Sequence, residues 1–432
     1  MAMLIRGGHL IDPAAGRDGV YDILVKDGIV AKLVEWTEGT APVWSEAAET
    51  VIEAEGKYVM PGFIDLHVHL REPGLEYKET IATGAMAAAA GGFTSVCPMP
   101  NTKPSTDTPE KIKALLEKAK QDAKIHILPI GAISIGQEGK ELADIKGMAE
   151  AGAVAFSEDG KSVMNSALYA EGLKLAAEAG VPVFAHCEDI DLVRGGVMNA
   201  GKRAKELGLP GITNAVEDII TARDIFLARE TGVKLHLCHC STKDSVKMIA
   251  LAKAEGLPVS GETGPHYFTM IDEEIPEDWG NYKMNPPLRG REDKEALIKA
   301  LQDNVLEAIA TDHAPHSKEE KEQSMLKSPF GIVGSETAYA LTVTELVRTG
   351  KITMTQLVER MSASPAKILG INKGSLQVGM PADITIADTE TAWSIDPEKF
   401  YSKGKNTPFA GKEVFGKIYY TIADGEIAFE QK

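Results

Sequence analysis

The two ends of the chain share one pattern of apolar and polar positions. Residues 22–35, DILVKDGIVAKLVE, and residues 417–429, KIYYTIADGEIAF, alternate apolar and polar residues on either side of an Asp-Gly pair. Alternation with period two around Asp-Gly predicts a β-hairpin with a two-residue turn. Neither end is long enough to form a convincing domain alone. We therefore predict that residues 1–60 and 376–432 together form one small β-sandwich domain.

The middle of the chain, residues 61–375, alternates short apolar runs with helical stretches such as YKETIATGAMAAAAGG and SALYAEGLKLAAEAG. The runs that read as buried strands are 62–70, 94–100, 124–133, 153–159, 181–189, 234–242, 257–266 and 305–315. Eight β units with helical connections predict an α/β fold, a (β/α)8 TIM-like barrel that forms the metal-dependent catalytic domain. An open doubly wound sheet is the alternative, but no GxGxxG follows an early strand to support it.

Composition narrows the class of protein. The chain has 432 residues, of which 44% are hydrophobic and 25% charged, as is normal for a soluble globular protein. A net charge of -17 disfavours a nucleic-acid surface, and no apolar run reaches the ~18 residues of a membrane span. The N-terminus lacks a signal-peptide pattern, which predicts a cytoplasmic protein. The cysteines lie in apolar runs without a CxxC pair and are predicted to be reduced core thiols: Cys97, Cys187, Cys238 and Cys240.

Polar side chains gather where the predicted strands end, which is where barrel enzymes place their chemistry. These residues are His67, His69, Arg71, Asn101, Glu158, Asp159, His186, His239, Asp312, His313 and His316. Because a strand has period two, His67 and His69 face the same side. Imidazole and carboxylate ligands suit zinc, and also manganese or cobalt. The pattern predicts a site for one or two divalent metals.

Each residue alone has an ordinary interpretation. A single HxH is often packing, a single buried histidine is more often hydrogen-bonded core, and an aspartate after a strand is usually a helix cap or a turn residue. Five strand ends with metal-type ligands in one barrel favour the metal site. His9 and His126 fall outside the pattern and are interpreted as structural, and His236 as packing or as support for a ligand. His266, at the end of the seventh strand, is either a supporting or a packing residue.

Seven segments together resemble the type I bacterial dihydroorotases of the amidohydrolase superfamily: PGFIDLHVHLREPG, MPNTKP, AFSEDG, AHCED, HCST, MNPPLR and ATDHAPHSKEEK. The resemblance covers essentially the whole chain. DxHxH identifies only the superfamily, whereas HLREPG and TDHAPH are more specific. Hydantoinases typically carry a carboxylated lysine where AFSEDG offers Asp159. Lys161 lies outside that position, so no carboxylated lysine is expected.

The resemblance also implies roles for individual residues. His67, His69 and Asp312 would hold one zinc, and His186 and His239 a second, with Asp159 shared between them. Arg71, Asn101 and His316 would bind the substrate carboxylate, and Asn285 the pyrimidine-ring side. From the residues themselves, the polar loop after the eighth strand turns glycine-rich, and Pro329–Gly334 is predicted to lie near the substrate rather than in an ordinary solvated connection.

The implied activity is the reversible cyclisation of N-carbamoyl-L-aspartate to L-dihydroorotate plus water in de novo pyrimidine (UMP) biosynthesis. Zinc-bound hydroxide would attack the ring carbonyl, and Asp312 would act as general acid and base. Another cyclic amidase, an allantoinase or hydantoinase, is disfavoured by Arg71 and TDHAPH. An inactive scaffold for aspartate carbamoyltransferase is disfavoured by the complete ligand set. The partners expected are a small-molecule substrate, a second copy in a homodimer and, optionally, a carbamoyltransferase.

Overall fold

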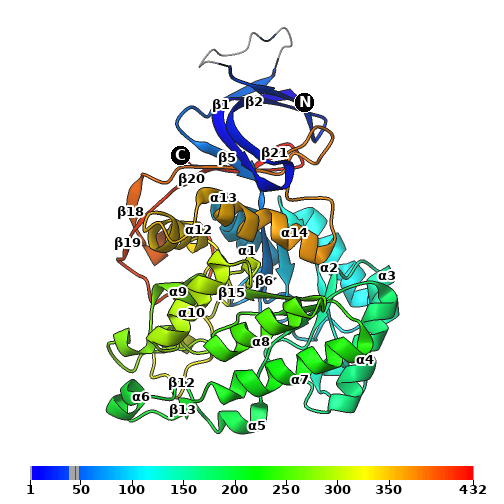
Figure 1. The fold of residues 1–432 in the computed structure, drawn as a ribbon, viewed down its shortest axis with the longest axis vertical. Helices are drawn as coiled ribbons and strands as arrows, with labels where there is room; N and C mark the ends of the chain where they lie inside the picture. The colour runs from blue at the N-terminus through cyan, green and yellow to red at the C-terminus, as the bar shows by residue number, and fades with distance from the viewer. Residues whose placement is uncertain (1, 38–43, 45–47, 432) are drawn as a thin grey trace.

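Strands from both ends of the chain share one mixed sheet in the computed structural model, which describes residues 2–37, 44 and 48–431. Its order is β21-β20-β17-β5-β1-β2-β3, with β4 beside β1. These strands are β1 (Ala2–Asp12), β2 (Arg17–Lys26), β3 (Ile29–Glu35), β4 (Thr50–Glu53), β5 (Tyr58–Pro61), β17 (Ile384–Ala387), β20 (Ile418–Ala423) and β21 (Glu426–Glu430). The two ends meet where β5 and β17 pair antiparallel, with Val59 opposite Ile386. In Figure 1 the blue and red strands accordingly occupy the same end of the molecule.

Both predicted hairpins are present in this sheet. The Asp27-Gly28 turn joins β2 to β3, and the Asp424-Gly425 turn joins β20 to β21. All four turn residues have positive φ, between 46° and 81°, as the favoured two-residue hairpin turn requires. Fully buried isoleucines from both chain ends, among them Ile5, Ile23, Ile384 and Ile422, pack into one apolar cluster. The sheet therefore has a core of its own.

Parallel strands fill the middle of the chain in two runs. One run is β6 (Phe63–Val68), β7 (Phe93–Pro98) and β8 (His126–Ile127). The other is β9 (Ile130–Ala132), β10 (Ala155–Ser157), β11 (Val183–Ala185), β14 (Leu235–Leu237), β15 (Val259–Thr263) and β16 (Ala308–Ile309). Two residues separate β8 from β9. At the other end, Val68, the last residue of β6, forms a parallel bridge with His313. The runs therefore meet at both ends, in an α/β arrangement.

Helices follow most of these strands: α1 (Ile81–Ala90), α2 (Pro109–Asp122), α3 (Ile145–Glu150), α4 (Ser166–Ala179), α7 (Ala215–Thr231), α8 (Lys243–Ala254), α10 (Arg291–Gln302), α12 (Ala338–Thr342), α13 (Met354–Val358) and α14 (Ser364–Leu369). In α4, Asn165 caps the first turn and Gly180 ends the helix with φ 76°. Tyr169, Leu173 and Ala176 form its buried face at helical spacing. Within the described ranges, no helix is both long and apolar enough to cross a membrane.

The strands differ from the sequence prediction in length. The predicted strand 124–133 is broken between β8 and β9, because Pro129 lacks a backbone N–H and restricts the residue before it. The strand predicted over 305–315 is regular only at Ala308–Ile309, and three residues beyond it Asp312 has φ 47°, which is incompatible with a strand. His266 lies in a short helix, α9 (Pro265–Thr269), rather than at the end of β15. The four cysteines are buried and free, as predicted.

Candidate metal centre

Side chains from three strand ends approach one another around His67. His67 lies in β6, His69 follows that strand, Asp159 follows β10, and Asp312 follows β16. The Nε2 atom of His67 is 3.2 Å from Asp159 Oδ1 and 3.6 Å from Asp312 Oδ1. Nε2 of His69 is 3.1 Å from the same oxygen of Asp312. The side chains of all four are almost completely buried, so these contacts lie out of bulk water.

Two further histidines complete the cluster on the other side of Asp159. Nδ1 of His186, after β11, is 2.9 Å from Nε2 of His239, after β14. The same two atoms are 3.4 Å and 3.7 Å from Asp159 Oδ1. The carboxylate of Asp159 therefore lies between a His67–His69–Asp312 group and a His186–His239 group. The cluster thus unites all six metal ligands predicted from the sequence.

The donor atoms fit a divalent cation. Nε2 of His67 and Oδ1 of Asp159, which face each other in the cluster, are buried without a hydrogen-bond partner among the described residues. Buried polar atoms normally have such partners, and a bound ion would supply them. Tetrahedral ligands about 2.0–2.1 Å from zinc lie roughly 3.3 Å apart, close to the separations seen here. Among the six predicted ligands, two triads have donor atoms close enough to share an ion: His67, His69 and Asp312, and His67, Asp159 and His239.

Unusual backbone conformation positions several of these groups. Arg71, His239 and Asp312 have φ of 63°, 35° and 47°, in the left-handed region that residues other than glycine rarely adopt. Asp65 holds the turn before Asp312, because its carboxylate accepts the Thr311 hydroxyl at 2.6 Å and the Thr311 N–H at 3.0 Å. Such strain persists where surrounding contacts impose it, and it concentrates at functional sites.

The predicted substrate-binding residues line a cavity of about 160 Å³ above the cluster, together with Phe330 and Gly331 of the predicted loop. Asn101 bridges the two regions: its Oδ1 is 2.9 Å from His69 Nδ1, and its Nδ2 donates to Asp159 at 3.3 Å. Arg71 Nη2 is 3.3 Å from His316 Nε2. Asn285 donates to Glu188 at 2.9 Å. The four residues therefore surround one space.

His316 has a strongly cationic environment. Burial, followed by the charges of Arg71 and Lys78, holds its pKa well below the usual range. Lys78 Nζ lies 3.0 Å from Nδ1 of the ring. The imidazole is therefore neutral, and Arg71 is the cationic side chain that lines the cavity. Lys78 was not identified from the sequence, where it stands in an ordinary polar run.

Two carboxylates that contact the outer ring nitrogens of these histidines were not identified from the sequence. Oε1 of fully buried Glu262, in β15, is 3.4 Å from Nδ1 of His67, and its Oε2 is 3.0 Å from Nε2 of His236. Glu188 is 3.0 Å from Nε2 of His186. Metal-binding histidines commonly use their second ring nitrogen in this way. His236 thus contacts the carboxylate that also faces His67.

Comparison with known proteins identifies the family. Residues 56–245 match the family described as dihydro-orotase-like. A dihydroorotase of Acetivibrio thermocellus is 47% identical over 100% of this chain and 99% of its own. A dihydroorotase of Staphylococcus epidermidis is 49% identical over 88% of this chain and 90% of its own. The chain belongs to the dihydroorotase family. As a family member it is a cyclic amide hydrolase of the amidohydrolase type.

The fold is also shared with hydantoinases. The solved structure of L-hydantoinase (dihydropyrimidinase) from Arthrobacter aurescens superposes with a TM-score of 0.87 at 28% identity, covering 99% of this chain and 96% of that one. The chain is 47% identical to a dihydroorotase but only 28% identical to this hydantoinase. The sequence identity therefore indicates the dihydroorotase family, and the hydantoinase shares the fold.

Proposed function

We propose that this protein catalyses the reversible cyclisation of N-carbamoyl-L-aspartate to L-dihydroorotate and water, a step of de novo pyrimidine biosynthesis. The observation that carries the proposal is the joining of six buried metal-type ligands to a cavity that contains Arg71. Dihydroorotases nearly half identical over the full chain support the choice of reaction. An open-chain dicarboxylate needs a cationic binding residue, and a neutral hydantoin ring does not.

Zinc is the proposed metal, as one or two ions per subunit. His67, His69 and Asp312 would hold the first, His186 and His239 the second, and Asp159 both. The buried atoms without hydrogen-bond partners support this assignment. Bound zinc lowers the pKa of water toward 7 and polarises a carbonyl oxygen. Glu262 and Glu188 would fix the orientation of His67 and His186 through their second ring nitrogens.

Asp312 is the proposed general acid and base. Burial alone would raise its pKa, but contact with His69 and His67 lowers the pKa to about 2, so the carboxylate is ionised at neutral pH. In hydrolysis it accepts a proton from the attacking water as the new C–O bond forms. The ring C–N bond then breaks, and the same proton passes from Asp312 to the leaving nitrogen. Cyclisation reverses these steps, with the proton taken from the carbamoyl nitrogen.

Arg71, Asn101 and His316 are proposed to bind the substrate carboxylate, and Asn285 the pyrimidine-ring side. The guanidinium can donate two parallel hydrogen bonds to a carboxylate, a geometry that a single ammonium cannot reproduce. Local positive charge matters here because the chain carries a net charge of -17 and repels an anionic substrate at long range. Phe330 and Gly331 would cover the bound substrate, which their place in the cavity wall supports.

The architecture proposed for this function is a (β/α)8 TIM-like barrel over residues 61–375, with a composite β-sandwich domain from residues 1–60 and 376–432. Contact between the two runs of parallel strands at both ends supports closure of the barrel. A cytoplasmic homodimer that optionally binds aspartate carbamoyltransferase is proposed as the working assembly. Light scattering of the protein alone, and then mixed with a carbamoyltransferase, tests both associations.

The reaction is tested with chelator-stripped protein assayed with and without zinc. We expect zinc-dependent formation of dihydroorotate from N-carbamoyl-L-aspartate, and at least 100-fold lower turnover of allantoin and hydantoin. The expected preference follows from the loss of the Arg71–carboxylate contact in both neutral rings. A zinc-loaded protein that opens hydantoin but not dihydroorotate would refute the proposal. Activity that survives complete removal of metal would refute the proposed role of the cluster.

A further inference from the structure

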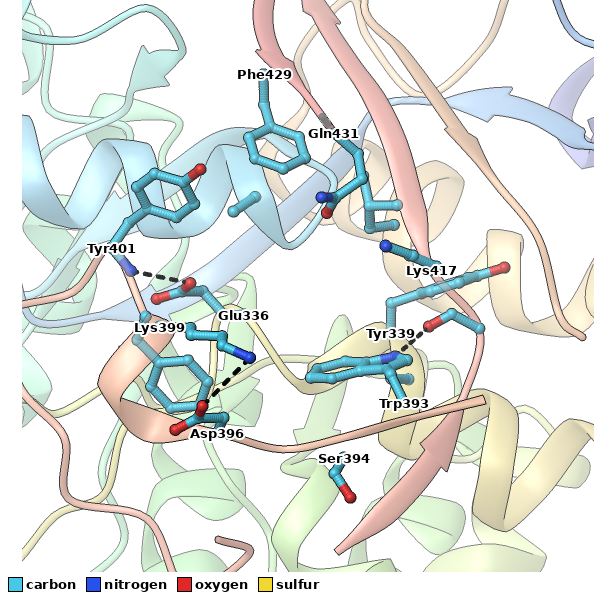
Figure 2. A pocket seen from close by; sticks show the side chains of 15 residues that line it. Glu336, Tyr339, Trp393, Ser394, Asp396, Lys399, Tyr401, Lys417, Phe429 and Gln431 are labelled. Carbon is cyan, nitrogen blue, oxygen red and sulfur yellow. Dashed lines mark hydrogen bonds and ion pairs between the residues drawn. The ribbon is translucent and has the colours of Figure 1, made fainter. Parts of the chain in front are cut away.

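A second, larger cavity lies away from the metal cluster, between the helices of the α/β part and the C-terminal strands. Its volume is about 640 Å³, against about 160 Å³ for the cavity above the cluster. Tyr339 of α12 and Phe429 of β21 contribute to its wall, as does Trp393 of β18 (Ala392–Ser394). Figure 2 shows these aromatic side chains around one open space. No residue in the wall belongs to the proposed active site.

The aromatic wall is held in place. Trp393 Nε1 donates to the Gly416 carbonyl at 2.9 Å, and the Tyr339 hydroxyl donates to the Asp388 carbonyl at 2.8 Å. The rings of Tyr401 and Phe429 meet edge-on with centroids 5.9 Å apart. Rigid rings give a planar ligand a surface to stack on at little cost in conformational entropy.

The charges inside this cavity do not balance. Figure 2 shows the ammonium groups of Lys399 and Lys417 directed into the space. Lys399 pairs with Asp396 at 3.4 Å, but no carboxylate in the described part of the chain pairs with Lys417. The other carboxylate in the wall, Glu336, accepts the N–H groups of Tyr401 and Ser402 at 3.0 and 3.1 Å. Burial raises the pKa of Glu336 to about 7, so it is partly neutral at physiological pH. Among the described residues of the wall, the ammonium group of Lys417 is therefore left without a carboxylate partner.

One stretch of chain, residues 400–406, borders this cavity and also holds the loops of the proposed active site. Its first residues, Phe400 and Tyr401, line the aromatic cavity. At its other end the Asn406 side chain accepts the His316 N–H at 3.1 Å and donates to the Gly331 carbonyl at 3.1 Å. We refer to residues 400–406 as the bridging segment. Between these ends, the Ser402 hydroxyl donates to buried Glu79.

The geometry points to a ligand site for an aromatic monoanion in this cavity, coupled to the substrate loop through the bridging segment. A fused ring system stacks on Trp393, and its carboxylate or sulfonate pairs with Lys417. Binding there restrains Phe400 and Tyr401, and through Asn406 it restrains the backbone at His316 and Gly331. The proposed ligand site does not depend on the proposed function. The coupling does depend on the proposed function, because that proposal makes His316 a substrate-binding residue.

The test is a fluorescence titration of the full chain with 8-anilinonaphthalene-1-sulfonate (ANS), an aromatic monoanion. We expect saturable binding at one site per chain. The variant Lys417→Met keeps the length of the side chain and removes its charge, and it should weaken the affinity at least tenfold. Lys140→Met, at an exposed lysine remote from the cavity wall, should leave the affinity unchanged. Unsaturable binding, or equal affinity in wild type and Lys417→Met, would overturn the site.

Two further titrations test the coupling to the substrate loop and the alternative that a second copy of the chain fills the cavity. An equilibrium mixture of dihydroorotate and carbamoyl-aspartate should tighten ANS binding at least threefold, because a bound carboxylate orders His316 and with it the bridging segment. No change in ANS affinity, in a protein that turns over dihydroorotate, would overturn the coupling. If a second copy of the chain fills the cavity instead, ANS affinity will fall as protein concentration rises, which would overturn the site. ANS binding needs no turnover, so failure of the proposed function leaves this readout intact.

Discussion

The buried carboxylate of Glu262 offers the sharpest test of how the metal centre is built. Its two oxygens contact two different imidazoles, at 3.4 Å from His67 and 3.0 Å from His236, and neither oxygen reaches solvent. Glu262→Gln keeps the shape and removes the negative charge. The glutamine amide offers one acceptor oxygen, so one of the two rings then faces an N–H donor, and water cannot reach the site to replace the lost acceptor. We expect zinc affinity to fall about 10- to 100-fold, roughly 1.4–2.8 kcal/mol.

Competition between the apoprotein and a chromophoric chelator measures that zinc affinity. Cobalt-loaded protein gives a second readout, since a reoriented His67 changes the visible absorption spectrum. Glu158→Gln is the matched control, a buried carboxylate one residue from Asp159 whose oxygens face the Ser134 N–H and hydroxyl. Zinc affinity within twofold of wild type in Glu262→Gln, with an unchanged cobalt spectrum, would refute the supporting role of Glu262.

Three other substitutions test separate parts of the account. Arg71→Lys keeps the positive charge but loses the planar, two-pronged guanidinium. The kcat/KM for dihydroorotate should therefore fall about 10- to 150-fold, mainly because KM rises. An unchanged KM in steady-state assays would contradict the proposed binding of the substrate carboxylate by Arg71. Asp312→Asn should lower kcat about 10²- to 10⁴-fold at full zinc occupancy, and activity near wild type would exclude it as the acid and base. Burial raises the pKa of Glu336 to about 7, above its value in an unfolded chain. Protonation of Glu336 therefore stabilises the folded state, and this stabilisation is lost as the pH rises from about 4.5 to 7. The Tm of Glu336→Gln, measured relative to the Tm of wild type, should therefore rise between pH 5 and pH 8. A Tm difference that stays constant over this range would refute the prediction.

The parts of the structure that the sequence predicted depend on neighbouring residues. Both Asp-Gly hairpins follow from alternation beside a turn that requires positive φ. His67 and His69 share a face because a strand has period two, and their rings lie 5.3 Å apart. The placement of polar residues at strand ends then follows from the alternation of strands and helices along the chain.

What could not be predicted depends on contacts between distant segments. His69 and Asp312 lie 243 residues apart in the chain, so their approach follows only from the complete fold. The assignment of ligands to two metals came from the family resemblance, not from spacing. Glu262 and Glu188 carry no local signal, because a carboxylate behind a histidine has the same sequence pattern as one on the surface. The break at Pro129 was predictable in principle, since proline interrupts a strand ladder.

The position of the metal is central to this account, and anomalous diffraction at the zinc edge of zinc-loaded crystals measures it most directly. We expect one or two peaks within about 2.0–2.2 Å of donor atoms in the cluster around Asp159. One peak should lie among His67, His69 and Asp312, and any second among Asp159, His186 and His239. A fully occupied zinc only at another group of metal-type side chains, His126, Asp383 and Asp424, would contradict the account.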